Sequence, residues 1–212
     1  MKLIFDFDHT LFSAKKLYFA LKEAFGKVGV DEKLFQETFE KSKGRGRDYK
    51  PQKQIKLIVK AKPEIPLKKL EKTFKKILKR APKFLYLDTL WFLRKWHEKT
   101  NLILLSYGEE KFQRDKIKAS KIGKYFQKKI KITRDIDKVK PFKRIFQNKA
   151  KIIFVEDNPK ALLKIKKNFP NVITVRINHG EGKYTKLPNN PRVDFSIKNL
   201  KQLDRILNKI KN

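Results

Sequence analysis

Three short apolar segments of the sequence end abruptly in acidic or small polar side chains. LIFDFD runs to Asp6 and Asp8, LILLSY contains Ser106, and IIFVED ends in Glu156 and Asp157. Burying an unpaired carboxylate is costly, so acids at the ends of apolar segments call for a reason. Short apolar strands that alternate with helices are typical of a parallel α/β sheet, which binds ligands at the carboxyl ends of its strands. We therefore expect these polar side chains to meet at one sheet edge.

Helical patterns fill the sequence between the first two of these segments. Apolar residues recur with helical spacing over 11–28, Asp31 is a plausible N-cap for a second helix, and the same spacing returns later. No good strand pattern interrupts this stretch. After it, strands and helices alternate: helices are expected over 85–98, 109–120, 141–148 and 161–168 and up to residue 210, and strands over 101–108, 128–132, 171–177 and 194–197.

The charge of the chain is strongly positive. Among 212 residues there are 55 Lys+Arg and 22 Asp+Glu, a formal net charge of +33. Such a field attracts polyanions, so non-specific binding to nucleic acid at low salt is expected. The basic residues are spread along the whole chain, which favours a general lysine bias over a dedicated binding surface. Self-repulsion at this charge favours a monomer.

The sequence also indicates where such a chain would reside. Asp6 and Asp8 interrupt the N-terminal apolar run, so no signal peptide is expected. No apolar run approaches the roughly 20 residues of a membrane-spanning helix. The chain has no cysteine, which excludes disulfides and thiolate metal sites and suits a reducing compartment. We expect a cytoplasmic protein with no membrane partner.

Four segments, taken together, resemble the four sequence motifs of the haloacid dehalogenase-like (HAD) hydrolases. DFDHT, from Asp6 to Thr10, is similar to the DxDxT nucleophile motif, and LILLSYG is similar to the second motif. VKPFKRIF, with Lys140 before Pro141, resembles the third, and IIFVEDNPKAL resembles the fourth. The motifs occur in the family's order, and the resemblance covers essentially the whole chain. It implies a phosphatase-type member with a helical C1 cap.

The resemblance also implies an α/β architecture in two parts. These are a Rossmann-like three-layer core with a parallel sheet, over residues 1–11 and 82–212, and a helical cap inserted after the first strand, over 12–81. The cap is expected to select the substrate by closing over the phosphate site. Its candidate lining residues lie between Gly44 and Tyr49, with aromatic residues such as Phe12 and Tyr18.

By this resemblance the chain is a Mg²⁺-dependent phosphatase that hydrolyses a phosphate monoester. Asp6 would attack phosphorus and form an aspartyl-phosphate. Asp8 would protonate the leaving oxygen and then activate the water that cleaves the intermediate. Thr10 would orient Asp6. The substrate would be a small phosphorylated molecule, with a nucleotide as one candidate. The sequence does not identify which molecule it is.

The remaining motif residues would hold the phosphate and the metal. Ser106, the adjacent N–H groups of Tyr107 and Gly108, and Lys140 would contact the phosphoryl group. Asp6, the backbone carbonyl of Asp8, and Asp157 would bind Mg²⁺.

The sequence departs from the common pattern at the last motif. Glu156 precedes Asp157, and Ala161 stands four residues after Asp157, so Glu156 either joins the metal shell or lies beside it.

Other interpretations of single residues stay open at this point. Ser106 or Asp157 would also serve as an ordinary helix cap, and Lys140 would also fit as a solvated surface lysine. A second hypothesis for the whole chain comes from a different class. It is a weakly active or inactive HAD-fold protein that binds nucleic acid through its basic surface.

Overall fold

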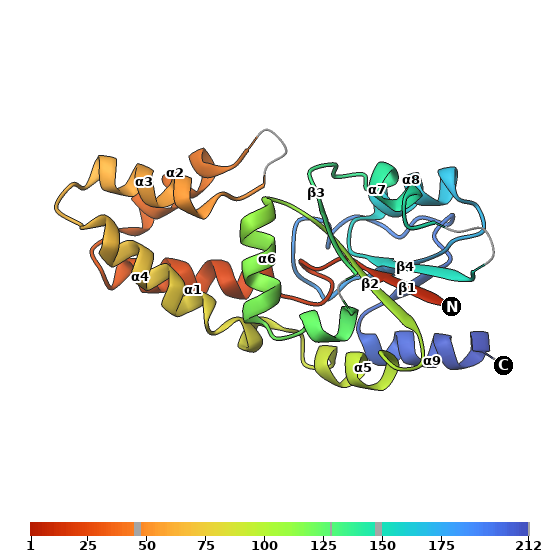
Figure 1. Cartoon of the computed structure of the whole chain (residues 1–212). Helices are drawn as coiled ribbons and strands as arrows, with labels where there is room; N and C mark the ends of the chain where they lie inside the picture. The colour runs from red at the N-terminus through yellow and green to blue at the C-terminus, as the bar shows by residue number, and fades with distance from the viewer. Residues whose placement is uncertain (45–47, 128, 147–149, 212) are drawn as a thin grey trace.

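The computed structural model describes residues 1–44, 48–127, 129–146 and 150–211. Within these residues six strands form one sheet in the order β3-β2-β1-β4-β5-β6, and every neighbouring pair is parallel (Figure 1). This arrangement confirms the expected α/β class. The strands are β1 (Lys2–Phe5), β2 (Asn101–Tyr107), β3 (Ile130–Thr133), β4 (Ile152–Glu156), β5 (Ile173–Ile177) and β6 (Phe195–Ile197).

The strand order places a topological switch point at β1. The chain leaves β1 toward β2 and β3 on one side, and later returns to place β4 on the other side. In the register, Phe5 at the end of β1 lies beside Leu104 of β2 and Val155 of β4. The residues that follow these positions therefore emerge at the same edge, which is where open parallel sheets bind their ligands.

Helices cover both faces of the sheet. Alternate residues of β1 face opposite sides: Leu3 and Phe5 belong to one buried cluster and Ile4 to the other. Figure 1 shows α5 and α9 on the first side and α7 and α8 on the second, which gives the three expected layers. The core helices are α5 (Thr89–Trp96), α6 (Glu110–Ala119), α7 (Val139–Lys143), α8 (Pro159–Asn168) and α9 (Leu200–Lys211), with 3-10 turns at Ala81–Phe84 and Gly123–Phe126.

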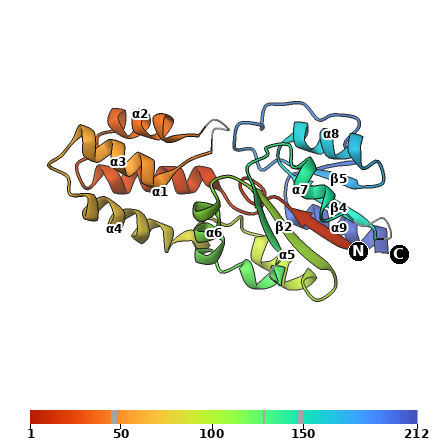
Figure 2. The same ribbon diagram turned by 45° about the horizontal axis from the view of Figure 1, so that its top comes forward.

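The first four helices that follow β1 within the described residues pack together at one end of the molecule (Figure 2). Ser13 and Asp31 cap the first two, with side chains that accept hydrogen bonds from the N–H groups of Lys16 and Leu34. The division into a core of 1–11 and 82–212 and a cap of 12–81 remains a proposal. The helices are α1 (Ala14–Gly26), α2 (Glu32–Ser42), α3 (Pro51–Ala61) and α4 (Leu67–Leu78).

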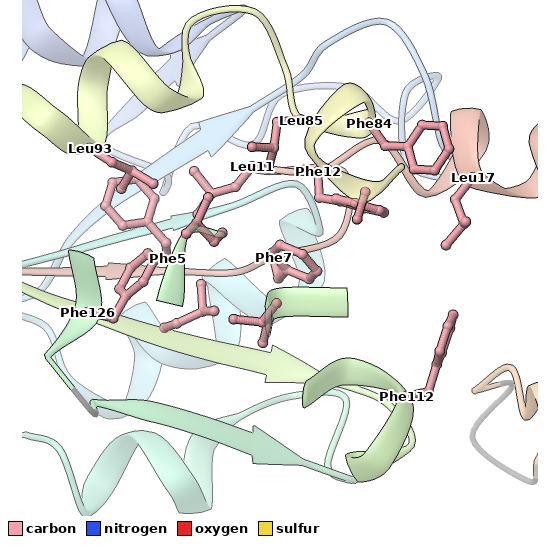
Figure 3. Close-up of a cluster of buried hydrophobic side chains, with 14 of the residues drawn as sticks. Phe5, Phe7, Leu11, Phe12, Leu17, Phe84, Leu85, Leu93, Phe112 and Phe126 are labelled. Atoms are coloured by element: carbon pink, nitrogen blue, oxygen red, sulfur yellow. The ribbon is translucent and has the colours of Figure 1, made fainter. Parts of the chain in front are cut away.

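Aromatic side chains join these helices to the core. Phe12 lies in the turn after β1, stacks on Phe7 with ring centroids 4.9 Å apart, and meets Phe84 edge to face (Figure 3). Phe112 of α6 lies 5.4 Å from the ring of Tyr49 and 5.9 Å from that of Phe74. Ring contacts therefore join α4 and the loop before α3 to α6.

Two helices begin later than the sequence pattern predicts. The helix expected over 11–28 starts at Ala14, because Leu11 and Phe12 are buried in the turn that leaves β1. The helix expected over 85–98 starts at Thr89, after Leu85 has paired with Phe12 in an isolated bridge. No helix within the described residues is both long and apolar enough to cross a membrane.

Candidate active site

Two strand ends bring three carboxylates together. Asp6 directly follows β1, Glu156 is the last residue of β4, and Asp157 follows it. One carboxylate oxygen from each of the three lies within 4.8 Å of the others. Asp6 and Glu156 are almost completely buried, so their charges are poorly screened by water. The expectation that acids of distant segments would meet at one sheet edge is confirmed.

A buried lysine lies between two of these carboxylates. The ammonium of Lys138 is 2.5 Å from Asp6 Oδ1 and 2.5 Å from Glu156 Oε2, and only 2% of the residue is exposed. Lys138 occupies the left-handed backbone region, with φ of 58°, directly before α7. A residue other than glycine adopts this conformation at an energetic cost, and such strain is found where the surroundings hold a side chain in a required place.

Lys138 stands where the sequence analysis expected Lys140, and this expectation was wrong. The sequence pattern predicts a helix that starts at Pro141, which makes Lys140 the residue before it. The helix begins at Val139, so Pro141 falls in its first turn and Lys138 precedes it. Lys140 is exposed and does not line the cavity that contains Lys138.

The crowded charges shift the proton affinities of these groups. Burial and the nearby charge of Glu156 raise the pKa of Asp6 to about 7, although Lys138 opposes them. Burial also raises the pKa of Asp157 well above its usual range, with added repulsion from Glu156 and Asp6. Burial lowers the pKa of Lys138, but Asp6 and Glu156 outweigh it, so the pKa is raised and the ammonium stays charged.

Asp8 lies beside this cluster and has partners of its own. Its two carboxylate oxygens are 2.6 and 2.7 Å from the ammonium of Lys116, and Gln113 Nε2 donates to it at 2.8 Å. Burial raises the pKa of Asp8, but Lys116 and Gln113 lower it more, so the net shift is downward. The structure therefore holds Asp8 as a carboxylate.

Neither Lys116 nor Gln113 is among the site residues predicted from the sequence. Both lie on α6, and Lys116 is 2% exposed, with its ammonium near the rings of Phe7, Phe12 and Phe112. The sequence does contain an indication that Lys116 is buried. Phe112 and Lys116 are four residues apart, which places them on the same face of one helix, and that face is buried. A lysine on an apolar helix face needs an anionic partner, and Asp8 supplies it.

The predicted phosphate-binding residues have mixed outcomes. Thr10 is buried and its hydroxyl donates to Asp6 Oδ2 at 3.4 Å, the long end of the hydrogen-bond range. Ser106 lies at the end of β2 with a buried hydroxyl that has no hydrogen-bond partner among the described residues. A phosphate oxygen would give this hydroxyl an acceptor.

The N–H of Gly108 already donates a hydrogen bond within the protein. It donates to the carbonyl of Thr133 at 3.1 Å, so its predicted use as a phosphate donor does not fit this structure. The glycine is nevertheless required. Its φ is 145°, and a Cβ there would lie 2.5 Å from Gln113 Nε2. Tyr107 lines the cavity at this edge, and its carbonyl accepts a hydrogen bond from Gln113 at 2.6 Å.

Two cavities open at this edge of the sheet. The first, here called the site cavity, measures about 230 Å³ and is lined by Asp6, Asp8, Lys138 and the acidic pair 156–157. The second, here called the cap cavity, also measures about 230 Å³ and lies between α6 and the helices of 12–81. Both are lined by Asp8, Tyr107 and Lys183, so they adjoin at those residues.

The predicted cap-lining residues are partly found at the second cavity. Tyr18, Asp48 and Tyr49 line it. Phe12 does not line it, because its ring is fully buried between Phe7 and the 3-10 turn that contains Phe84. Residues 45–47, also among the expected lining, lie outside the described residues.

The residues at the sheet edge suit a hard divalent cation. Asp6, Glu156 and Asp157 offer oxygen donors alone, and three carboxylates facing one ammonium leave negative charge uncompensated. Mg²⁺ prefers a small number of carboxylate oxygens and keeps several waters. Glu156 is within this cluster, so it offers a carboxylate oxygen at the same place as Asp157. Asp157 does not cap α8, because Asn158 accepts the hydrogen bond from the N–H of Lys160.

Comparisons with known proteins support this fold. No protein-family model matches the chain, and no curated protein matches it by sequence. A solved structure described as a haloacid dehalogenase-like hydrolase, from Burkholderia xenovorans LB400, superposes with a TM-score of 0.76 over 95% of this chain and 96% of its own, at 18% identity.

Two further solved structures resemble the chain over nearly its whole length. The HAD-hydrolase YfnB from Bacillus subtilis, described with bound magnesium, has a TM-score of 0.63 at 18% identity, covering 98% of both chains. An L-2-haloacid dehalogenase from Xanthobacter autotrophicus has a TM-score of 0.60 at 14% identity, also covering 98% of both. The chain has the fold of the haloacid dehalogenase-like hydrolases.

Proposed function

We propose that the chain is a Mg²⁺-dependent phosphatase that hydrolyses a phosphate monoester through an aspartyl-phosphate on Asp6. One observation carries this proposal. The carboxylate of Asp6 lies with Glu156 and Asp157 at the switch point of the sheet, and the second acid, Asp8, lines the same cavity. This set provides a nucleophile, an acid–base group and hard metal ligands in one place.

The chain's own residues divide the first step between them. Asp6 attacks phosphorus, so a bond forms between a carboxylate oxygen and phosphorus while the bond to the ester oxygen breaks. The leaving oxygen takes up a proton that Asp8 relays from the P–OH group of the monoester monoanion. Lys138 stays charged beside Asp6 Oδ1 and offsets negative charge on the phosphoryl group. The buried hydroxyl of Ser106 donates to a phosphoryl oxygen. Asp6, Glu156 and Asp157 would hold Mg²⁺, which supplies further compensation of charge on the phosphoryl oxygens.

The second step needs a base, and Asp8 is held in the form that can act as one. Its pKa is lowered by Lys116 and Gln113, so it is a carboxylate at neutral pH. As a carboxylate it accepts a proton from the water that attacks the aspartyl-phosphate. The products are inorganic phosphate and the free carboxylate of Asp6.

Dehalogenation is the competing reaction on this fold, since one similar structure is a dehalogenase. Both reactions would begin with attack by Asp6. Asp8 favours phosphoryl transfer, because an alkoxide leaving group needs a proton, which a carboxylate can relay to it from the substrate's P–OH group, whereas a halide needs none. The three-carboxylate cluster favours it too, because a halide is displaced from carbon without a divalent cation on the substrate.

The experiment is hydrolysis of p-nitrophenyl phosphate by the wild type and by Asp6→Asn, with Mg²⁺ and after its removal by a chelator. We expect a rate at least about 10³-fold lower for Asp6→Asn and a comparable loss without metal. Asp115→Asn on the outer side of α6 is the matched control and should keep wild-type activity. Equal rates for wild type and Asp6→Asn contradict the proposal, as does halide release from a 2-haloacid without phosphatase activity.

The proposed metal site has a separate readout that does not depend on turnover. Calorimetric titration with Mg²⁺ alone should show one site in the wild type. Glu156→Gln should weaken this binding by about tenfold or more, since it removes one negatively charged oxygen ligand from the cluster. Unchanged Mg²⁺ affinity in Glu156→Gln would place Glu156 beside the shell rather than in it.

A further inference from the structure

The cap cavity has a defined place relative to the reacting groups. It meets the site cavity at Asp8, Tyr107 and Lys183. If the proposed function holds, the phosphoryl group occupies the site cavity beside Asp6, and Asp8 lies on the leaving-group side. The ester's alcohol portion then extends past Asp8 into the cap cavity.

The walls of this cavity are largely apolar. Leu17 and Leu21 of α1 form one side, with Phe39 of α2, and Phe112 of α6 forms the other. In Figure 3 the side chains of Leu17 and Phe112 point toward one another from α1 and α6. A ligand portion placed between them loses its water and gains contacts with carbon atoms.

Aromatic rings continue along the same wall from the cap helices to the core. Tyr18 meets Phe39 at a centroid distance of 4.8 Å, and Phe39 meets Tyr49 at 4.7 Å. Tyr49 then meets Phe112 edge to face at 5.4 Å. Ring faces and edges of this kind bind apolar and aromatic groups.

Several polar groups of the cavity are already bonded within the protein. The hydroxyl of Tyr49 donates to Gln54 Oε1 at 2.5 Å. Lys116 and Gln113 bind Asp8. The carboxylate of Glu109 accepts from two N–H groups at the start of α6. A sugar or nucleoside would bring hydroxyls that lose water against apolar walls, and Tyr49, Lys116 and Gln113 could bond them only by giving up a present partner.

We propose that the cap cavity takes the alcohol portion of the substrate and that this alcohol is compact and apolar or aromatic. The substrate class is then the phosphate monoester of such an alcohol, rather than a sugar phosphate or a nucleotide. The proposal deepens the proposed phosphatase function and rests on it for the placement of the phosphoryl group.

The first experiment compares esters of alcohols that all leave as alkoxides, so that leaving-group acidity does not decide the result. The set is 2-phenylethyl phosphate, hexyl phosphate, glycerol 3-phosphate, glucose 6-phosphate and AMP. We expect kcat/KM for the first two to exceed the others by about tenfold or more. Glucose 6-phosphate or AMP hydrolysed as efficiently as 2-phenylethyl phosphate overturns the proposal.

Variants on α1 test whether the cavity wall is the cause. Tyr18→Ala should lower the preference for 2-phenylethyl phosphate over glycerol 3-phosphate by about fivefold to tenfold. Phe19→Ala is the control, because Phe19 is the next residue, is 51% exposed and does not line the cavity. Thermal melting of both variants checks that they fold. An equal loss of preference in both, or in neither, counts against the proposal.

Direct binding separates this proposal from the phosphatase function. Calorimetry compares 2-phenylethylphosphonate, which cannot be hydrolysed, with inorganic phosphate on the wild type in the presence of Mg²⁺. We expect the phosphonate to bind at least about tenfold more tightly, and Tyr18→Ala to remove most of the difference. If no ester is hydrolysed, the proposed phosphatase function is wrong. The binding comparison still shows whether the cap cavity binds an apolar group. Equal affinities for the two ligands overturn the inference even if esters are hydrolysed.

Discussion

The site cavity and the cap cavity have the same volume, about 230 Å³, and opposite character. The first is built from strand ends and gathers three carboxylates and Lys138. The second is built from an inserted group of helices and is walled by leucine and aromatic side chains. Asp8 lies where they meet. In the proposed function, the chemistry belongs to the sheet edge, and the choice of alcohol belongs to the helices packed on it.

Each cavity also contains a buried lysine paired with an aspartate. Lys138 serves the sheet edge and touches two acids, while Lys116 on α6 touches Asp8 alone. Removing one partner of a buried pair leaves the other charge uncompensated, which is far costlier than losing an exposed pair. Substitutions at Lys138 and Lys116 therefore test the contributions of the two cavities separately.

The largest effect is expected at the sheet edge, from Lys138→Met. Loss of the ammonium leaves Asp6 and Glu156 facing each other without a cation from the protein. We expect phosphatase activity to fall by at least about 10²-fold. Lys140→Met is the matched control, because that lysine is exposed two residues away, and its activity should stay within about twofold of wild type. The reverse ranking of these two variants would restore the sequence-based assignment of Lys140.

A smaller loss is expected at the border of the cavities, from Lys116→Met. Methionine fills the space among the three phenylalanine rings but cannot bind Asp8. We expect kcat to fall by about tenfold to 10²-fold because Asp8 loses its orientation, while Mg²⁺ affinity stays near that of the wild type. Lys118→Met, on the outer face of α6, should change neither quantity. A loss of Mg²⁺ affinity in Lys116→Met would tie this lysine to the sheet-edge cluster instead.

The loop that borders both cavities provides a pH test. His179 stacks on Tyr86 at a centroid distance of 3.5 Å, and its Nε2 lies 3.1 Å from the carbonyl of Thr10. Burial lowers the pKa of His179 below its usual 6.5, although the Thr10 carbonyl opposes this. The unfolded chain therefore takes up a proton on this group at higher pH than the folded chain.

The sign of the expected pH effect follows. The contribution of neutral His179 to stability is complete above the unfolded pKa of about 6.5 and is lost as pH falls below it. Melting temperatures of the wild type and His179→Gln, measured between about pH 7.5 and about pH 5.5, should differ in slope, with the smaller fall in the variant. Parallel slopes would mean that His179 titrates alike in both states.

The smallest effect is expected on the outer side of α6. Glu110 and Arg114 form an exposed pair one turn apart, with Arg114 Nη2 at 2.9 Å from Glu110 Oε1. Glu110→Gln should change the free energy of unfolding by less than about 0.5 kcal/mol, as measured by denaturant titration. A cost above about 2 kcal/mol would show that charge pairs on the two sides of this helix do not differ as proposed.

Much of the fold could be predicted because the strand signals are local. The segments ending at Asp6, Ser106 and Glu156 are short and apolar, and in a parallel sheet their ends must share one edge. The lysine of the site was misplaced by two residues, because proline is accepted within the first turn of a helix as well as at its start. The left-handed backbone at residue 138 directs the Lys138 side chain inward, and this conformation could not be predicted from the sequence.

The cap cavity was harder to foresee. Tyr18 was expected to line it, but Phe12 proved to be core, because helical spacing alone does not show which apolar face meets which neighbour. Lys116 was overlooked among so many lysines, although its place on the apolar face of α6 marked it. The partner that makes its burial tolerable, Asp8, is 108 residues away in the sequence.

The covalent intermediate on Asp6 is the most direct test of the mechanism. Asp8→Asn is mixed with p-nitrophenyl phosphate and Mg²⁺, quenched in acid and weighed intact; nitrophenolate leaves without a proton, so only the second step should be slow. We predict that the variant gains the mass of one phosphoryl group, located on Asp6 by peptide mapping, and that the double variant Asp6→Asn/Asp8→Asn gains none. Turnover by the wild type with no phosphoryl adduct on Asp6 in Asp8→Asn would contradict the account.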